Sequence, residues 1–285
     1  MKDPIIILGP GRCGSTLLQR ILNTSADMTI WGEHGGFMKG LAQSYFMLTE
    51  SELLKRNIYG RERITPSMVI GAFTDYGESI NWVNSFNNEI VRERYTELIV
   101  KLLNNGLDVE KTSWGFKEIL YNKNDRTMDM WLELFPKTKV VFSLRHPYDV
   151  IRSMIVSWEN PKLLKEQLET NNLNEIKESS LRYAARWNNV VSSFQYWINE
   201  KEIIYKVEKY EDLMEKPKKS IKDIFQFIEI EMPATALEPM SVRVEASQKL
   251  DYEKEVRRIV YEMGQEIWQI VGSTAEYFGY EEKEI

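Results

Sequence analysis

The segment that most constrains the fold lies at the start of the chain, where an apolar run, Ile5 to Leu8, leads directly into a glycine-rich stretch, Gly9 to Gly14. A continuous run of large apolar residues is typical of a strand buried on both faces of a parallel sheet. Residues 15–22 then place apolar side chains at helical spacing, which predicts a helix. Strand, loop and helix in this order open a βαβ unit and predict an α/β fold.

The rest of the chain continues this alternation. Further strands are predicted at 29–36, where a short strand ends in a turn, and at 114–119, 139–144 and 202–207. Helices are predicted at 128–135, 147–158, 161–178, around 183–197, at 218–228 and at 252–278, the last with a break at Gly264 or Gly272. We therefore expect one domain, 1–285, with a P-loop-like, doubly wound, mainly parallel sheet flanked by helices.

Residues 37–110 stand apart from this alternation because they are mostly helical by pattern. Interruptions are predicted near Gly60, at Thr65 and Pro66, and between Gly71 and Gly77. Ligands bind at the carboxyl ends of the strands in folds of this class. We expect the segment to be a helical insertion over that C-terminal edge of the sheet, on the side where ligands bind.

The glycine-rich loop has the spacing of a phosphate-binding loop. It reads G-x-x-x-x-G-S-T, the frame of a nucleoside-triphosphate P-loop with Ser15 in place of the lysine. Glycines let backbone N–H groups converge on an anion, and the helix N-terminus adds the positive end of its dipole. Arg12 can supply the charge that the lysine would bring, so we expect the loop to bind a 5′-phosphate without the apparatus for ATP hydrolysis. The residues expected to contact the nucleotide are Gly11, Arg12, Cys13, Gly14, Ser15 and Thr16.

A second anion motif follows the apolar strand at 139–144. Arg145 comes directly after this strand, and Ser153 lies two turns into the next helix, which Pro147 begins. A planar guanidinium and a nearby hydroxyl make a good receptor for a terminal phosphate. His146, directly before Pro147, is interpreted as a helix cap. Two anion sites on one sheet edge suit a nucleotide that carries both a 5′- and a 3′-phosphate.

The charge composition argues against two classes of binding partner, nucleic acid and anionic membranes. Lys plus Arg is 37 and Asp plus Glu is 43, which gives a net charge of −6. A chain this acidic is a poor candidate for binding nucleic acid or an anionic membrane surface. Cys13 is the single cysteine, so no internal disulfide forms, and the apolar run at 5–8 is too short for a signal peptide or membrane span. We expect a cytoplasmic protein.

The two motifs together resemble those of the sulfotransferases that use 3′-phosphoadenosine 5′-phosphosulfate (PAPS) as donor. Residues 5–18 look like the family's 5′-phosphosulfate loop, and residues 140–158 are similar to its 3′-phosphate motif. Tyr210 to Leu213 and Ala275 to Tyr280 resemble two further family segments. The likeness is to the group related to tyrosylprotein and bacterial small-molecule sulfotransferases. Cys13 departs from the pattern because the family's loop usually has serine there.

The resemblance implies catalytic residues as well. In that group an acidic residue follows the first helix in a turn and a lysine lies on a middle strand, and Glu33 and Lys117 fill these places here. Lys117 is then expected to neutralise charge on the bridging oxygen, and Glu33 to take the acceptor proton, with His34 as the rival base. Lys249 is a further candidate for contact with the nucleotide. Sulfuryl transfer does not require a metal, and one cysteine with two histidines does not make the common zinc sites.

These features predict transfer of a sulfuryl group from PAPS to a hydroxyl or amine of a small-molecule acceptor. The acceptor is expected to be a natural product, for which the acidic chain favours a cationic alkaloid. A protein-tyrosine sulfotransferase, a P-loop nucleotide kinase with a degenerate Walker A motif and a non-enzymatic nucleotide-binding protein are the alternatives. Four tryptophans are candidates either for the acceptor pocket or for ordinary packing: Trp31, Trp82, Trp114 and Trp158. Two others, Trp187 and Trp197, are expected in the core.

Overall fold

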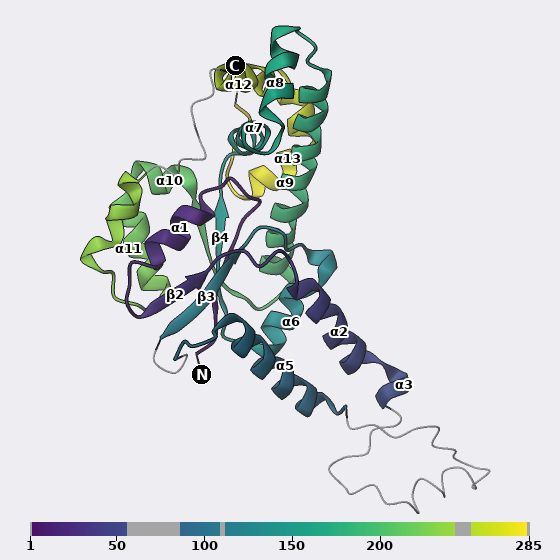
Figure 1. Cartoon of the computed structure of the whole chain (residues 1–285), viewed down its shortest axis with the longest axis vertical. Helices are drawn as coiled ribbons and strands as arrows, with labels where there is room; N and C mark the ends of the chain where they lie inside the picture. Colours follow the sequence, from purple (N-terminus) through teal and green to yellow (C-terminus); the bar gives the residue numbers. More distant parts are fainter. Residues whose placement is uncertain (1, 56–85, 109–111, 243–251, 284–285) are drawn as a thin grey trace, which may run out of the picture. The chain divides into compact units, whose positions relative to one another are not determined.

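The structure, a computed structural model, describes residues 2–55, 86–108, 112–242 and 252–283 (Figure 1). The chain divides into two compact units. The first comprises Met1–Gly36, Asp108–Asn124 and Lys137–Ile285, and the second Phe37–Leu107 and Asp125–Pro136. The predicted insertion therefore supplies most of a unit of its own.

A five-stranded sheet lies at the centre of the first unit, and every neighbouring pair of its strands is parallel. Its strands are β1 (Ile5–Leu8), β2 (Met28–Trp31), β3 (Ser113–Glu118), β4 (Lys139–Leu144) and β5 (Ile204–Lys209), in the order β2-β3-β1-β4-β5. All four residues of β1 are buried, as the unbroken apolar run predicts for a strand covered on both faces. The predicted α/β fold class is confirmed.

Helices cover both faces of this sheet (Figure 1). Alternate residues Ile5, Ile7 and Val141 pack in one core cluster with α1 (Ser15–Leu22), α11 (Pro217–Ile228) and the 3-10 helix η2 (Ala234–Ser241). On the other face Phe142 stacks on Phe194, with ring centroids 4.4 Å apart. Phe194 belongs to the long helix α9 (Asn174–Glu200). Alternation along the strands thus divides the core into two layers.

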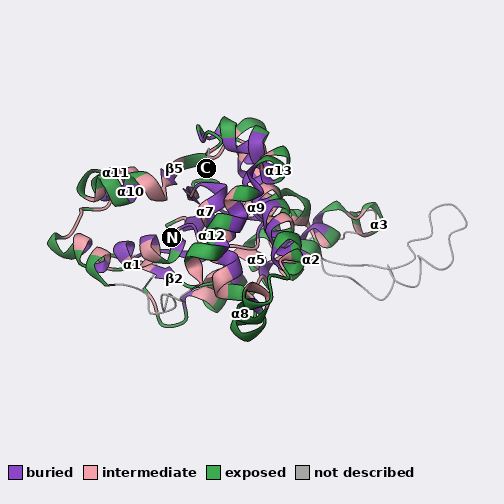
Figure 2. Ribbon diagram, turned by 90° about the horizontal axis from the view of Figure 1, so that it is seen from above, coloured by how far each residue is buried: buried purple, intermediate pink, exposed green. Residues whose placement is uncertain are grey.

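Three further helices surround α9 on that side. They are α7 (Pro147–Trp158), α12 (Glu253–Glu262) and α13 (Gly264–Tyr277). Buried residues gather where α7 and α9 meet (Figure 2), and Trp187 and Trp197 lie fully in this core, as predicted. No helix in the described part of the chain is long and apolar enough to cross a membrane.

Two predicted elements differ from the structure, and a predicted helix break is confirmed. The helix predicted at 161–178 is wrong, because α8 (Pro161–Glu169) ends before α9 begins, and Asn171 between them has a positive φ of 53° that no helix continues. Strand β5 lies two residues later than predicted. The predicted break at Gly264 is confirmed, because α12 ends at Glu262 and α13 begins at Gly264.

The second unit is helical in its described part, as the pattern of residues 37–110 predicts. Its helices are α2 (Met38–Glu50), α3 (Glu52–Lys55), α5 (Asn88–Leu103) and α6 (Thr127–Leu134). Helix α2 packs on both α5 and α6, and Arg126 holds Glu50 through two hydrogen bonds of 2.8 and 2.7 Å. The predicted interruptions between residues 60 and 77 lie outside the described residues, and the placement of the insertion over the sheet edge stays a prediction.

Candidate active site

The glycine-rich loop joins β1, the central strand, to α1 at the C-terminal edge of the sheet. Its backbone is in the left-handed region at Gly11, Arg12 and Gly14, with φ of 84°, 54° and 92°. Glycine adopts these angles without strain. A Cβ atom on Gly14 would lie 2.6 Å from the ring of Tyr210, so the loop also needs glycine there for its close packing. The loop therefore turns tightly into the N-terminus of α1, as an anion site requires.

The structure brings the two predicted anion motifs together. Arg12 Nε donates a hydrogen bond of 3.1 Å to Ser153 Oγ on α7. Arg145 Nη1 lies 3.5 Å from the Arg12 carbonyl oxygen, and its guanidinium lies 4.5 Å from the ring centroid of Tyr210. Tyr210 begins the short helix α10 (Tyr210–Glu215). Three segments far apart in the sequence thus meet here: the glycine-rich loop, residues 145–153 and Tyr210.

The two guanidiniums form an electropositive pair. Burial lowers the pKa of Arg12, and the nearby charge of Arg145 lowers it further. Within the described ranges no carboxylate forms an ion pair with either arginine. Two like charges in a half-buried site repel each other, and a bound anion relieves that repulsion. The pair is therefore ready for an anionic ligand.

The other loop residues expected to hold the nucleotide differ in their surroundings. The Cys13 side chain is fully buried, and its carbonyl oxygen accepts a hydrogen bond of 3.1 Å from Ser143 Oγ. Ser15 is buried at the start of α1, while Thr16 Oγ1 lies 3.4 Å from Lys117 Nζ. Cys13 thus braces the loop against β4. Lys249 lies outside the described residues.

Lys117 and Glu33 are in direct contact, although in the sequence only the family resemblance links them. Lys117 Nζ donates a hydrogen bond to Glu33 Oε1, and the two form an ion pair. The Lys117 side chain is 6% exposed and that of Glu33 39% exposed. The buried lysine is therefore fixed between Thr16 of the glycine-rich loop and a carboxylate that solvent can reach.

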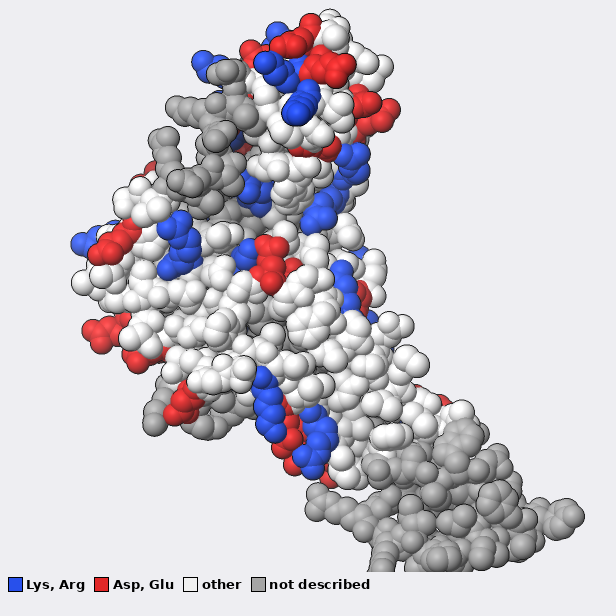
Figure 3. Space-filling model, in the orientation of Figure 1, with Lys and Arg blue, Asp and Glu red and all other residues white. Residues whose placement is uncertain are grey.

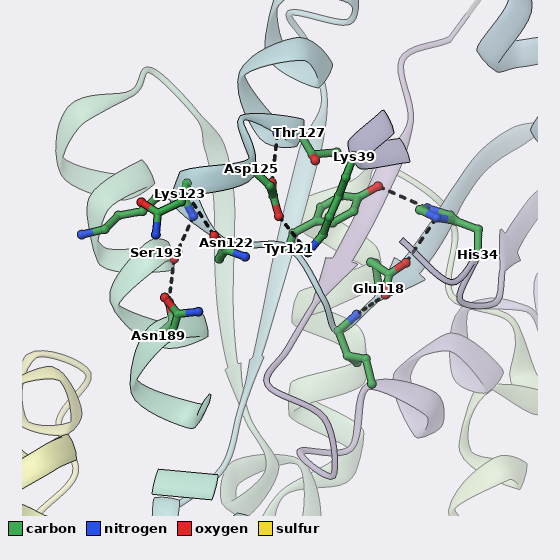
Figure 4. Close-up of polar contacts among 12 residues, drawn as sticks. His34, Lys39, Glu118, Tyr121, Asn122, Lys123, Asp125, Thr127, Asn189 and Ser193 are labelled. Carbon is green, nitrogen blue, oxygen red and sulfur yellow. Dashed lines mark hydrogen bonds and ion pairs between the residues drawn. The ribbon is translucent and has the colours of Figure 1, made fainter. Parts of the chain in front are cut away.

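His34 belongs to a separate buried network, shown in Figure 4. Its Nδ1 lies 3.2 Å from Glu118 Oε2, and its Nε2 lies 3.2 Å from the Tyr121 hydroxyl. Burial lowers the pKa of His34, although the Glu118 charge acts in the opposite direction. A neutral ring near pH 7 with its proton on Nδ1 accepts a hydrogen bond at Nε2 from Tyr121. Nδ1 lies within ion-pair distance of Glu118 but makes no hydrogen bond to it.

Several residues near the site had no role in the sequence reasoning. Tyr210 was quoted only as part of a family segment, yet it packs on Gly14 and under Arg145. Glu118 and Tyr121 were not singled out. The sequence does hold a signal for Glu118, because it is an acidic residue at the end of a buried strand. A carboxylate is rarely fully buried unless it is paired, so a partner such as His34 could have been expected.

Three of the four tryptophans considered for an acceptor pocket lie in the described residues. Trp114 is fully buried, and its Nε1 donates to the Lys2 carbonyl oxygen at 2.9 Å, which marks it as a core residue. Trp31 is 37% exposed and Trp158 is 40% exposed. Trp158 lies against Gly11 of the loop, so it is the tryptophan placed to meet a ligand of the loop. Trp82 is outside the described residues.

Comparison with known proteins gives the same family that the two anion motifs predict. The model of the sulfotransferase family matches residues 4–234. The chain belongs to the sulfotransferase family. It is a sulfotransferase enzyme, and the family predicted from the two anion motifs is confirmed. No curated protein matches the chain.

Two solved structures share the fold. A sulfotransferase domain from the curacin biosynthetic pathway is 16% identical, with a TM-score of 0.58 over 99% of this chain and 99% of that one. A sulfotransferase domain of the Synechococcus PCC 7002 olefin synthase is 18% identical, with a TM-score of 0.54 over 99% of this chain and 97% of that one. At these identities the comparison shows a shared fold, and the shared fold extends over nearly the whole chain.

Proposed function

We propose that this sulfotransferase transfers SO₃ from PAPS to a hydroxyl or amine group of a small natural product, leaving adenosine 3′,5′-bisphosphate. The natural-product class is supported by the solved domain named for the curacin biosynthetic pathway, which has the same fold. The face drawn in Figure 3 carries described basic and acidic side chains in small mixed groups rather than as one basic surface. Such a surface suits a small acceptor better than nucleic acid.

The observation that carries this proposal is the pair formed by Arg12 and Arg145. The two guanidiniums lie beside one glycine-rich loop, and Arg12 is bonded to Ser153 from the second motif. A donor with a phosphosulfate at one end and a phosphate at the other needs two neighbouring cationic anchors. In this assignment Arg12, Ser15 and Thr16 hold the 5′-phosphosulfate, while Arg145 and Ser153 hold the 3′-phosphate.

Lys117 is the group proposed to stabilise the leaving phosphate oxygen. It lies next to Thr16 of the loop, and its buried position makes its charge more effective than in water. When the donor is bound, PAPS supplies an activated sulfuryl group. As the S–O bond to the phosphate breaks, Lys117 neutralises the charge that develops on the bridging oxygen.

Glu33 is the group proposed to take the proton from the acceptor. Its carboxylate is partly exposed and in contact with Lys117, which places it beside the reacting groups. The bond between the acceptor oxygen or nitrogen and sulfur forms while this proton moves to Glu33. His34 is less suited to the role, because its side chain is buried and its Nε2 is hydrogen-bonded to Tyr121. We assign His34 a positioning role for the turn that carries Glu33.

Mass spectrometry of an acceptor panel tests the proposal. The purified chain is incubated with PAPS and small alcohols, phenols and amines, and each product is examined for the gain of one SO₃. Calorimetry with adenosine 3′,5′-bisphosphate tests donor binding independently of any acceptor. Magnesium-dependent turnover of ATP without binding of the bisphosphate would contradict the proposal and favour a kinase.

A further inference from the structure

Two arginines one turn apart on α9 differ in how their charges are satisfied. Arg182 donates to Glu159 Oε1 at 2.6 Å and to Ser179 Oγ at 2.9 Å. Arg186 makes no hydrogen bond or ion pair with any residue in the described part of the chain, and its Nε atom is buried without an acceptor. A buried donor in this state costs free energy unless a ligand supplies the acceptor. Arg186 thus differs from an ordinary surface arginine.

Arg186 is close to the phosphate loop. Its guanidinium carbon lies 5.1 Å from the ring centroid of Trp158, a distance at which the cation and the indole attract each other. Trp158 also lies against Gly11, with Cη2 3.0 Å from the position that a Cβ atom on Gly11 would occupy. The same aromatic ring therefore lies close both to Arg186 and to the residue that precedes Arg12.

The anions of the donor do not account for this third cation. The 5′-phosphosulfate is assigned to the loop with Arg12, and the 3′-phosphate to Arg145 and Ser153. The second substrate must approach the same loop, and the partly exposed ring of Trp158 offers it an apolar surface. A guanidinium held over that ring keeps its planar set of N–H groups, which matches the two oxygens of a carboxylate.

We propose that Arg186 recognises a carboxylate on the acceptor and that the enzyme selects anionic acceptors. This inference rests on the proposed function and adds the chemical class of the acceptor. It differs from the cationic acceptor that the net charge of −6 favours. Net charge governs solubility and approach over long distances, whereas a single cation beside the bound acceptor acts at contact distance.

Binding is the first test. The protein is saturated with adenosine 3′,5′-bisphosphate and titrated with three matched phenols: 4-hydroxyphenylacetate, its uncharged amide, and the cationic tyramine. Tryptophan fluorescence is the readout, and the W158F variant identifies the signal of Trp158. The carboxylate is expected to bind at least about tenfold more tightly than the other two, the difference typical of a charged hydrogen bond.

Variants on α9 test whether Arg186 causes the preference for the carboxylate. R186Q is expected to remove the preference for the carboxylate and R186K to restore part of it, while R182Q, which removes a paired arginine from the same helix, keeps it. Equal binding of the three phenols, or equal behaviour of R186Q and R182Q, would overturn the inference. It is also overturned if R186Q weakens binding of the bisphosphate as strongly as R145A, because the anion would then belong to the donor. Failure of the wild-type protein to bind the bisphosphate refutes the proposed function instead.

Discussion

Arg12 Nε and Ser153 Oγ are joined by a hydrogen bond of 3.1 Å, which connects the phosphate loop to α7. The two residues come from the two motifs that the sequence predicts to hold opposite ends of one nucleotide. Because the bond holds them side by side, a ligand that reaches one is within reach of the other. The consequences for binding and catalysis are testable residue by residue.

Replacing Arg145 by alanine is expected to weaken binding of adenosine 3′,5′-bisphosphate by about 10- to 150-fold. This range corresponds to the loss of charged hydrogen bonds worth about 1.5–3 kcal/mol. Isothermal titration calorimetry measures the change. R258A is the control, since Arg258 is an exposed arginine on α12 paired with Glu262, and its affinity should equal that of the wild type. Equal affinities for all three proteins would remove Arg145 from the site.

Replacing Lys117 by alanine is expected to lower turnover by about 10²–10³-fold, the usual effect of removing one group that stabilises charge in a transition state. The affinity for adenosine 3′,5′-bisphosphate should fall much less than turnover does, because Arg12 and Arg145 still hold the two phosphates. Steady-state kinetics and calorimetry on the same preparation separate the two quantities. A variant that loses binding as much as turnover would show that Lys117 holds the nucleotide instead.

The E33Q variant is expected to lose about 10²–10⁴-fold in kcat, because the amide keeps the shape of the side chain but takes up no proton. The H34Q variant should lose less, since His34 is held between Glu118 and Tyr121 and acts on the turn that carries Glu33. The profile of kcat against pH separates them: the acidic limb should disappear in E33Q and persist in H34Q. The reverse order of effects would make His34 the base.

Gly14 is expected to tolerate no side chain. G14A places a non-glycine residue at φ 92° and its Cβ 2.6 Å from the Tyr210 ring, which should destabilise the fold by about 1–3 kcal/mol. The control is G40A, at an exposed position of α2 with no atom near its Cβ, where alanine should stabilise by about 0.5–1 kcal/mol. Urea unfolding measures both. An unchanged midpoint for G14A would contradict the loop geometry.

Acidification is expected to destabilise the protein through its two histidines. Burial lowers the pKa of both His34 and His146, so the folded state takes up fewer protons than the unfolded state below the ordinary value of about 6.5. The free energy of unfolding should therefore be constant above that pH and fall as the pH drops toward the lowered values. Urea titrations between pH 7.5 and 5.5 measure the slope, which should flatten in the double variant H34Q/H146Q. An equal slope in both proteins would assign the effect to other groups.

Much of the fold could be predicted from the sequence, because its main signals are local. The apolar run at Ile5 to Leu8 and the one at 139–144 become the strands of the sheet centre, and Pro147 begins α7 as expected. The helix at 161–178 was wrong because its break depends on Asn171, a residue that adopts a positive φ more readily than most but gives no signal as strong as glycine.

The site was predicted less completely than the fold. Arg12 and Ser153 could be named from their motifs, and the structure adds that they touch. Glu118 and Tyr210 act through contacts with segments far away in the chain, and no local pattern encodes such contacts. Arg186 stands out only because its neighbour one turn away is paired while it is not.

The central position of β1 also bears on how the protein reaches its native state. Both of its sheet partners lie more than a hundred residues further along the chain. Contacts this distant in sequence close long loops at an entropic cost before they give any stability, so proteins rich in them fold slowly. The glycine-rich loop that follows β1 can reach its final place on the ribosome only after β4 has been synthesised, and the assembly of the proposed nucleotide site should be among the late steps of folding.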